Sequence, residues 1–383
     1  MCPLCSSNQT KFLYQPKNSK VDLKINICTR CSFVFSTYNE LKIDNNTSKS
    51  KFSHLSCEAD YSDIRVGKQQ MIHYFKSLAP LIFKKDIKHV LDFRSARGDF
   101  IDYALSYFNL DEIDCIEEDS YMTELYDNNE KVKIHRGKYH TAFPGKKYDL
   151  IYCCHSLEHY KQPNKVLKFL SSKLDEGGVL YIDVPNLLFL NNEVNLDEYF
   201  YDKHLSYFSS VSLSAALKNN NLNPEVIDND DFSNGKNLAI ISYKSSSVGS
   251  PIYDNDYSKY ESLILEYEKN LNKNRDKLSK SKSLINQIFS PEKINGVVGC
   301  GKMLDAFLKY GDLDVNNFSY FFDDFIIKCS SSVFNKKLSV SDDLFEKQMD
   351  NLLVLIKEPP KLLKNKINKL KSRTKVYYFE EFV

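Results

Sequence analysis

Strand-like and helical segments alternate along the middle of the chain. The strand-like segments are rich in Val, Ile and Tyr, whereas the segments between them repeat apolar residues at the helical period. The strand-like segments are 89–93, 112–119, 148–154 and 179–186, and the helical ones are 99–108, 120–128 and 163–174. Strands and helices that alternate at this spacing form βαβ units. The pattern therefore predicts an α/β domain with a doubly wound, mostly parallel sheet.

The chain is too long for one domain of ordinary size, because domains commonly hold about 100 to 200 residues and this chain has 383. A second pattern of strand, glycine loop, helix and strand occupies its last part, after a charged helical segment that contains no glycine. We therefore expect a cysteine module at 1–50, an α/β domain at 65–247, a connecting helix at 255–290 and a smaller Rossmann-like domain at 291–383.

Charge and composition exclude several classes of partner. The 52 Lys and Arg residues balance 51 Asp and Glu residues, which leaves a net charge of +1, so we expect no nucleic-acid or membrane partner. No apolar run approaches the ~20 residues that a spanning helix needs, and the first residues lack the apolar stretch of a secretory signal. Ten cysteines without such a signal indicate thiols or metal ligands in a reducing compartment. The expected location is therefore cytoplasmic.

Two pairs of cysteines with the same internal spacing lie near the start of the chain. Cys2 and Cys5 form one C-x2-C pair, and Cys28 and Cys31 form another after 22 intervening residues. Two such pairs can complete a four-sulfur zinc shell, and four protein ligands make the predicted zinc structural; free or redox-active thiols are the alternative. The other cysteines lack this spacing, and most are expected to be buried apolar side chains. They are Cys57, Cys115, Cys153, Cys154, Cys300 and Cys329.

The loop after the first strand of the α/β domain has the features of a nucleotide-binding turn. Asp92 ends the strand, Gly98 follows six residues later, and Glu117 ends the next strand nineteen residues beyond Gly98. An acid at that separation can accept hydrogen bonds from the ribose hydroxyls of an adenosine cofactor. These residues leave both a dinucleotide and S-adenosylmethionine open.

The segment that begins with the third strand distinguishes these cofactors. A strand that starts with Tyr148 and Asp149, a His-x-Leu-Glu-His turn at 155–159, a helix and a glycine pair before the next strand resemble the class I methyltransferase pattern. The resemblance implies S-adenosylmethionine as the cofactor. The positions that fall on the pattern are Tyr148, Asp149, His155, Leu157, Glu158, His159, Pro163, Gly177, Gly178, Pro185 and Asn186.

The order of the parts resembles one family in particular. A four-cysteine segment, the methyltransferase pattern, the stretch 202–209 and a second Rossmann-like unit are similar to the sugar C-methyltransferase family over nearly the whole chain. In the last unit the similarity rests on 296–308 and 321–325. Family members transfer a methyl group from S-adenosylmethionine to a carbon of a nucleotide-linked keto-deoxysugar. The resemblance implies a sugar-nucleotide substrate and a role in polysaccharide biosynthesis, and we expect a monomer or a homodimer.

The first loop departs from the family pattern. The family has a glycine–cysteine–glycine turn where this chain has Arg94, Ser95 and Ala96. Arg94 either crowds the methionine end of the cofactor or binds its carboxylate through a bidentate contact. Because the acids and the glycine around the loop persist, we expect cofactor binding to be retained. The expected cofactor-binding residues are Asp92, Arg94, Ala96, Gly98, Glu117 and His155.

The stretch after the domain's last predicted parallel strand holds the candidate catalytic residues. The family shows tyrosine–histidine–glutamate–histidine where this chain has Tyr201, Asp202, Lys203 and His204. The resemblance implies that His204 is the base that removes the proton beside the sugar ketone and that Tyr201 stabilises the enolate. Lys203, in place of an acid, is expected to lower the pKa of that base.

Several alternatives stay open at this point. A buried, hydrogen-bonded histidine of the core is the alternative for His204, and a cap on the following helix is the alternative for Glu158 and His159. Among functions, methyl transfer to a sugar oxygen is the nearest rival. A degenerate relative that only binds a sugar nucleotide is the other, and the Arg94 loop is the feature that favours it.

Overall fold

The computed structural model describes residues 1–17, 19, 21–38, 75, 86–94, 98–117, 128–191, 194–196, 198–227, 236–245, 249–324, 326–328, 332–357 and 359–383. These residues group into two compact units. The first takes in the described residues up to Glu193 together with Phe200–Tyr267, and the second takes in Val194–Tyr199 and Glu268–Val383. Residues 120–127 of the expected helix at 120–128, and residues Ala96, Cys57 and Cys329, lie outside the described ranges.

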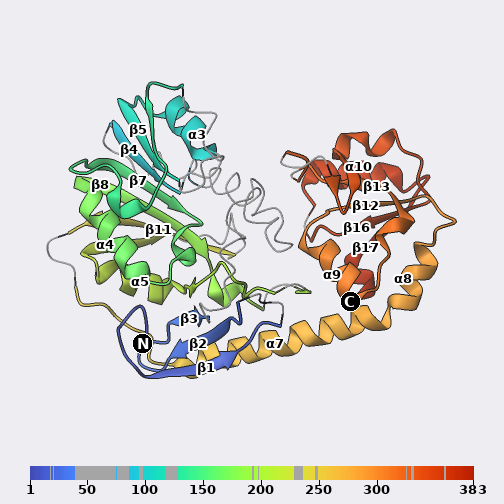
Figure 1. Cartoon of the computed structure of the whole chain (residues 1–383), viewed down its shortest axis with the longest axis horizontal. Coiled ribbons are helices and arrows are strands. Elements are labelled where there is room, and N and C mark those ends of the chain that lie inside the picture. The colour runs from blue at the N-terminus through green and yellow to red at the C-terminus, as the bar shows by residue number, and fades with distance from the viewer. Residues whose placement is uncertain are drawn as a thin grey trace. The chain divides into compact units, whose positions relative to one another are not determined.

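A seven-stranded sheet is the centre of the first unit (Figure 1). Its order is β10-β11-β8-β7-β4-β5-β6, and the five strands from β8 to β6 are parallel, whereas β11 and β10 are antiparallel additions at one edge. The strands are β4 (His89–Phe93), β5 (Glu112–Ile116), β6 (Val132–His135), β7 (Tyr148–Cys154), β8 (Leu174–Pro185), β10 (Leu222–Ile227) and β11 (Asn237–Lys244). The predicted α/β class with a mostly parallel sheet is confirmed.

Helices cover both faces of this sheet, as Figure 1 shows. Alternate residues of β7 enter different cores, because successive side chains of a strand point to opposite faces: Ile151 packs with one cluster and Tyr152 with the other. One cluster includes residues of α4 (Pro163–Lys173) and α5 (Ser210–Lys218), and the other includes residues of α3 (Asp99–Tyr107). Burial on both faces explains why β7 reads as a continuous apolar run.

A second, four-stranded sheet joins the cysteine segment to the α/β part of the same unit. It has the order β1-β2-β3-β9. The strands β1 (Thr10–Tyr14), β2 (Lys24–Cys28) and β3 (Val34–Thr37) come from the start of the chain, whereas β9 (Ser206–Tyr207) directly follows the predicted catalytic stretch. Cys2, Cys28 and Cys31 also belong to the core cluster that includes α4 and α5. The N-terminal segment therefore shares its core with the α/β sheet.

The second unit repeats the α/β principle on a smaller scale. Its sheet has the order β14-β15-β13-β12-β16-β17 and is parallel except for the β14–β15 pair. The strands are β12 (Asn295–Val298), β13 (Phe318–Phe322), β14 (Ser332–Val333), β15 (Lys336–Ser339), β16 (Asn351–Val354) and β17 (Lys375–Tyr378), and the helices are α9 (Lys302–Tyr310) and α10 (Lys361–Leu370). The predicted smaller Rossmann-like fold is confirmed.

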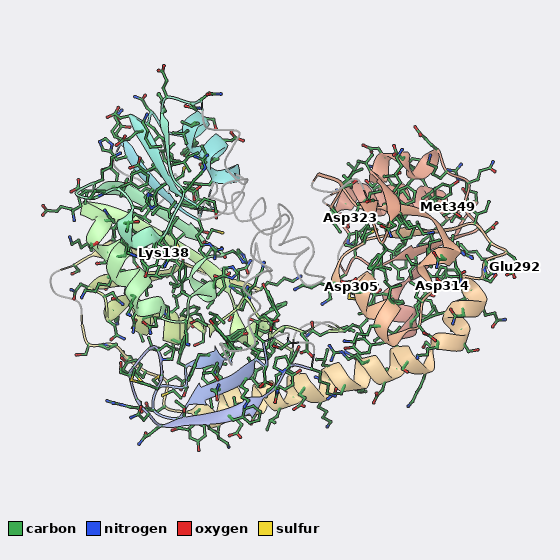
Figure 2. All side chains as sticks on the ribbon, viewed as in Figure 1. Lys138, Glu292, Asp305, Asp314, Asp323 and Met349 are labelled. Carbon is green, nitrogen blue, oxygen red and sulfur yellow. The ribbon has the colours of Figure 1, made fainter. Side chains whose placement is uncertain are left out.

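Side chains of the second unit itself contact the glycine loop that follows β12. Gly299 has a φ of +90°, and a Cβ there would lie 2.8 Å from Cγ1 of Ile356, so only glycine fits without displacement. The backbone N–H of the buried Cys300 donates to Oδ2 of Asp323 at 3.0 Å, and the N–H of Ile326 donates to Oδ1 at 2.7 Å. Asp323 is labelled in Figure 2. The acid after β13 thus holds two loops of its own unit.

The connecting helix predicted at 255–290 is two helices, α7 (Tyr257–Lys280) and α8 (Lys282–Ile288). The break lies at Ser281, whose hydroxyl donates to the carbonyl of Lys277 at 3.1 Å. Such a bond from a serine to a carbonyl four residues earlier commonly bends a helix.

Within the second unit, Arg275 of α7 anchors the short piece Val194–Tyr199. Its Nε donates to the carbonyl of the buried Leu196 at 2.9 Å, its Nη1 lies 3.1 Å from Oε1 of Glu198, and its guanidinium lies 4.6 Å from the ring centre of Tyr310. A guanidinium with these contacts is held in place from several sides.

Within the described ranges, no helix is both long enough and apolar enough for a membrane crossing.

Candidate active site

The strand order reverses between β4 and β7 in the first unit, because the chain proceeds from β4 to β5 on one side and later to β7 on the other. In open α/β sheets, ligands bind outside the carboxyl ends of the strands at such a point. Arg94 follows β4, Glu117 follows β5 and His155 follows β7. Three of the predicted cofactor residues therefore lie at the end of the sheet where a ligand is expected.

The loop after β4 keeps a glycine-like backbone although its first residue is an arginine. Arg94 has a φ of +59°, and its N–H donates to the carbonyl of Ile116 at 2.8 Å. A left-handed conformation costs a residue with a Cβ roughly 1 to 2 kcal/mol. Gly98, with a φ of +80°, then leads into α3. Arg94 thus has the positive φ that favours glycine at a position where the family has glycine, and Asp92 at the strand end is buried.

Glu117 is a buried acid at the carboxyl end of β5. Its backbone N–H donates to the carbonyl of His135 at 3.1 Å, which fixes the residue beside the end of β6. A fixed carboxylate at the end of this strand is the group that a ribose diol requires. This hydrogen-bond acceptor at the edge of the sheet therefore suits an adenosine cofactor.

His155 lies between two buried carboxylates. Its Nδ1 is 3.4 Å from Oε1 of Glu158, and its Nε2 is 3.7 Å from Oδ1 of Asp183. The backbone of His155 has a φ of +43°, and its N–H donates to the carbonyl of Asp183 at 2.8 Å. The turn after β7 thus directs an imidazole back toward β8.

The two carboxylates differ in how readily they ionise. Burial raises the pKa of Asp183 to about 7, and the neighbouring His155 only partly opposes this. Burial by itself would also raise the pKa of Glu158, but the interactions with His155 and His159 outweigh it and hold that pKa below its ordinary value. Near neutral pH, Glu158 is therefore the ionised acid of the pair, whereas Asp183 titrates.

The turn η5 (Leu157–His159) is bonded to the predicted catalytic stretch. The N–H of Leu205 donates to the carbonyl of Glu158 at 2.8 Å, and Nδ1 of His159 lies 3.0 Å from the carbonyl of Lys203. If His159 carries its proton on Nδ1, the ring donates to that carbonyl and leaves Nε2 as an acceptor. Two motifs that are some forty residues apart in the sequence are thus joined side by side.

Tyr201 and His204 are in direct contact. The hydroxyl of Tyr201 lies 2.6 Å from Nε2 of His204, which is 6% exposed. Oε1 of Glu158 is 3.9 Å from the same Nε2, and the ring of His159 is 5.0 Å away between centroids. The side chain of Lys203 is exposed. The charged groups that the structure records beside His204 are therefore the acid and the imidazole of η5.

The result is one continuous row of titratable side chains: Asp183, His155, Glu158, His204 and Tyr201. An ionised acid beside imidazoles favours their protonated form, so this row can accept and hold a proton.

Sequence reasoning singled out three members of this row and missed the role of the two acids. The capping alternative for Glu158 and His159 is wrong, since α4 begins after Gln162 without a side-chain cap. The signal for Asp183 is an acid inside the buried apolar run 179–184 of β8.

The four N-terminal cysteines converge on one point. The Sγ atoms of Cys2 and Cys31 are 3.6 Å apart, as are those of Cys5 and Cys28, and all four lie within 4.8 Å of one another. A tetrahedron with zinc–sulfur bonds of about 2.3 Å has edges of about 3.8 Å. A hydrogen bond with Cys31 lowers the pKa of Cys2 to about 6, whereas burial raises the pKa of Cys5 to about 11. A bound metal ion would need these side chains as thiolates. The donor set fits a structural zinc ion. Of the other cysteines, the described ones are buried: Cys115, Cys153, Cys154 and Cys300.

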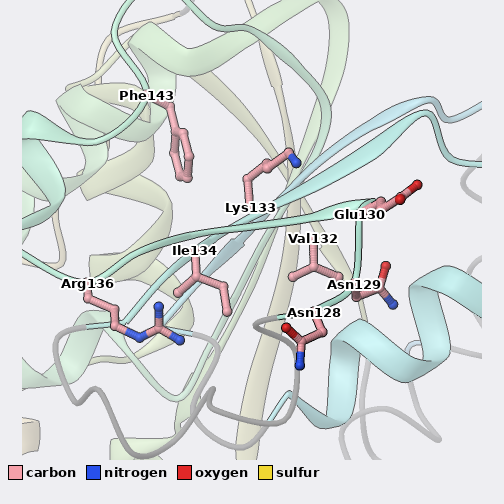
Figure 3. Close-up of a pocket in the computed structure, with 8 residues that line it drawn as sticks. All are labelled: Asn128, Asn129, Glu130, Val132, Lys133, Ile134, Arg136 and Phe143. Carbon is pink, nitrogen blue, oxygen red and sulfur yellow. The ribbon is translucent and has the colours of Figure 1, made fainter.

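A separate pocket of about 390 Å³ lies along β6, the outer strand of the sheet (Figure 3). In Figure 3, Val132 and Ile134 project from one side of this strand and Lys133 from the other. The lining residues are Asn128, Asn129, Glu130, Val132, Lys133, Ile134, Arg136 and Phe143. None of the predicted site residues lines this pocket.

Comparison with known proteins bears on the first unit. Residues 67–226 match the family model described as a methyltransferase domain, and no curated protein matches the chain. The plantazolicin methyltransferase BpumL in complex with SAH is 15% identical, with a TM-score of 0.42, over 52% of this chain and 91% of that one. An S-adenosylmethionine-dependent methyltransferase from Clostridium acetobutylicum is 15% identical, with a TM-score of 0.37, over 50% and 95%. The SAM-bound amino pentose methyltransferase CalS10 from Micromonospora echinaspora is 12% identical, with a TM-score of 0.38, over 47% and 91%. The family match indicates a methyltransferase domain over residues 67–226, which contain the five parallel strands of the sheet described above.

Proposed function

We propose that this protein transfers a methyl group from S-adenosylmethionine to a carbon beside the ketone of a nucleotide-linked sugar, with His204 as the base. One observation carries the proposal: the hydroxyl of Tyr201 lies 2.6 Å from Nε2 of a buried His204, inside the row of titratable groups behind the carboxyl ends of β7 and β8. A base and a hydroxyl donor held together suit enolate formation.

In the first proposed step, His204 acts as the base and Tyr201 stabilises the enolate. The imidazole of His204 removes the proton from the carbon next to the ketone, the electron pair moves to the carbonyl oxygen, and an imidazolium and an enolate result. The hydroxyl of Tyr201 then donates to the enolate oxygen. Glu158, 3.9 Å from Nε2 of His204, offsets the positive charge that the base has gained.

The cofactor is proposed to bind at the edge formed by β4, β5 and β7. When bound, it supplies an electrophilic methyl group on a sulfonium. Asp92 and Gly98 shape the loop, Glu117 holds the ribose hydroxyls, and His155 and Ala96 complete the proposed contact set. The side chain of Glu117 is buried and its backbone is fixed, which supports this assignment.

Arg94 is proposed to bind the carboxylate of the cofactor, because an arginine can offer two parallel donors to it. Arg94→Gly is then expected to weaken the binding of S-adenosylhomocysteine, measured by calorimetry. Tighter binding would mean that the arginine obstructs the loop.

The zinc ion is proposed to be held by Cys2, Cys5, Cys28 and Cys31 and to support the catalytic stretch from the other side. The hydroxyl of Ser36 on β3 donates to the carbonyl of His204 at 3.2 Å. Through such contacts, a metal that fixes the N-terminal segment also fixes the backbone of the base.

Hydrogen exchange in heavy water tests the proposed carbon chemistry. With S-adenosylhomocysteine bound, the wild type should exchange the proton beside the ketone of a keto-sugar nucleotide, and NMR should detect deuterium there. His204→Ala should lose the exchange and lose 10²- to 10⁴-fold in methylation rate, the usual effect of removing a general base, with unchanged cofactor affinity. No exchange with any keto sugar, together with methylation of an unoxidised sugar, would favour the oxygen alternative. No binding of S-adenosylhomocysteine at all would favour the degenerate relative.

A further inference from the structure

Three imidazoles of the first unit approach the carboxylate of Glu158. Its Oε1 lies 3.4 Å from Nδ1 of His155, 3.9 Å from Nε2 of His159 and 3.9 Å from Nε2 of His204. Glu158 is 1% exposed, so water does not screen its charge from these rings. The charge of this buried acid therefore raises the pKa of the imidazoles that it faces.

We infer that Glu158 is a positioning residue whose charge sets the proton affinity of His204 and thereby the pH at which the base works. The inference rests on the proposed function only where it names His204 as the base. Glu158 itself lies behind the imidazole and touches no reacting atom in this assignment.

The distances show how Glu158 acts. At 3.9 Å, its oxygen is too far from His204 for a direct hydrogen bond, but a charge at about 4 to 6 Å still favours the ionised form of an opposite partner. The hydrogen bond between Tyr201 and His204 fixes the imidazole, so the separation from the carboxylate is set. The effect on His204 is therefore electrostatic rather than a direct proton transfer.

The two other imidazoles that face Glu158 have further polar contacts of their own. His155 also faces Asp183 at 3.7 Å, so a second carboxylate shares its positive charge. His159 is oriented by its contact with the carbonyl of Lys203 at 3.0 Å. His204 faces the hydroxyl of Tyr201, the acid Glu158 and the ring of His159. Of these three groups, Glu158 carries the negative charge that favours the protonated form of His204.

Replacing the acid by its neutral isostere tests the inference without any substrate. In Glu158→Gln, the pKa of His204, followed by NMR of the imidazole signals in the full-length protein, should fall by about 1 to 2 units, because an opposite charge at this range shifts a pKa by that order. Glu158→Asp keeps the charge and should restore most of the shift. Glu176→Gln is the matched control: it removes one exposed acid from the same unit, at the amino end of β8, and should leave the three histidines unchanged.

A kinetic measurement connects this shift to turnover. A lower pKa keeps the base unprotonated to lower pH, so the acid limb of kcat/KM in Glu158→Gln should move down by the same 1 to 2 units. Because the NMR arm needs no substrate, a failure of the proposed sugar chemistry leaves it intact.

Two results would overturn the inference. One is a titration of His204 that is the same in Glu158→Gln and in the wild type. The other is a second metal ion, beyond that of the four thiols, that metal analysis finds in the wild type and not in Glu158→Gln. Glu158, His159 and His204 would then be ligands, since their donor atoms lie within 4.8 Å of one another.

Discussion

The two units of this protein bury charge in different ways. In the second unit, Arg275 has a permanent charge and is matched by Glu198 at 3.1 Å and by the ring of Tyr310. In the first unit, the buried Glu158 faces three imidazoles, and histidine is the side chain whose ordinary pKa places its charge change near physiological pH. An ion pair such as that of Arg275 and Glu198 stabilises the fold, whereas a row of titratable groups can accept and release protons. The contrast separates a structural use of buried charge from the catalytic use that we propose.

The acids that follow the second strand in chain order of each α/β sheet, β5 and β13, show the same contrast. Glu117 follows β5, and Asp323 follows β13. Both carboxylate oxygens of Asp323 accept backbone N–H groups of its own unit, from Cys300 and Ile326. The strand, glycine loop, helix and acid pattern therefore predicts a Rossmann-like fold in both places, but the polar contacts decide whether the acid serves a ligand.

Metal loss is the largest change that we expect. The double variant Cys28→Ser, Cys31→Ser should reduce the zinc content from about one ion to none, because two ligands cannot hold a structural site. Structural zinc in small modules contributes an apparent binding free energy of about 10 to 16 kcal/mol. Metal analysis of the purified protein measures the content, and a wild type without zinc would contradict the proposed site.

The buried pair of the second unit provides the next largest effect. Arg275→Met leaves Glu198 buried without its partner, and such a change commonly costs about 3 to 5 kcal/mol. Denaturant unfolding should show this loss. Arg373→Met is the control in the same unit, because that exposed side chain donates only to the carbonyl of Phe345. Equal stability of the two variants would show that the pair contributes nothing.

The sequence predicted the elements that depend on local pattern and missed those that depend on distant contacts. The apolar run of β7 predicts its strand, and the spacing of Asp92 and Gly98 predicts the loop. The pairing of β9 with β3 depends on residues more than 150 positions apart, which no periodicity records. The break at Ser281 follows from a bond between side chain and backbone inside an otherwise regular helical pattern.

The candidate site shows the same division. His155, Tyr201 and His204 were singled out by their motifs, and those roles stay predictions. The sequence predicts that Lys203 provides the charge beside His204, because the two residues are adjacent. In the structure, that side chain is exposed, and the neighbouring charge comes from Glu158, on a turn some forty residues earlier. Adjacency in a loop does not determine which way a side chain points.

The pH dependence of stability provides the third test of the comparison. Burial raises the pKa of Asp183 from 3.8 to about 7, so the folded state binds a proton that the unfolded state releases between these values. This contribution to stability is fully present below pH 3.8 and is lost as the pH rises through 7. Its size is up to about 4 kcal/mol, at about 1.4 kcal/mol for each pKa unit. Asp183→Asn should remove this slope from unfolding free energies measured between pH 4 and 7, whereas a slope that is unchanged would contradict the assignment.

The smallest expected effect concerns the two acids that follow the second strands. Glu117→Ala should weaken the binding of S-adenosylhomocysteine by roughly 1.5 to 3 kcal/mol, the scale of a hydrogen bond to a charged group. Asp323→Asn is its counterpart in the second unit and should leave that affinity unchanged, because both oxygens of Asp323 already serve backbone groups. Calorimetry on the full-length protein measures both. Equal affinity in the wild type and in Glu117→Ala would place the cofactor elsewhere. A loss in Asp323→Asn as large as that in Glu117→Ala would remove the distinction between an acid that serves a ligand and an acid that serves its own loop.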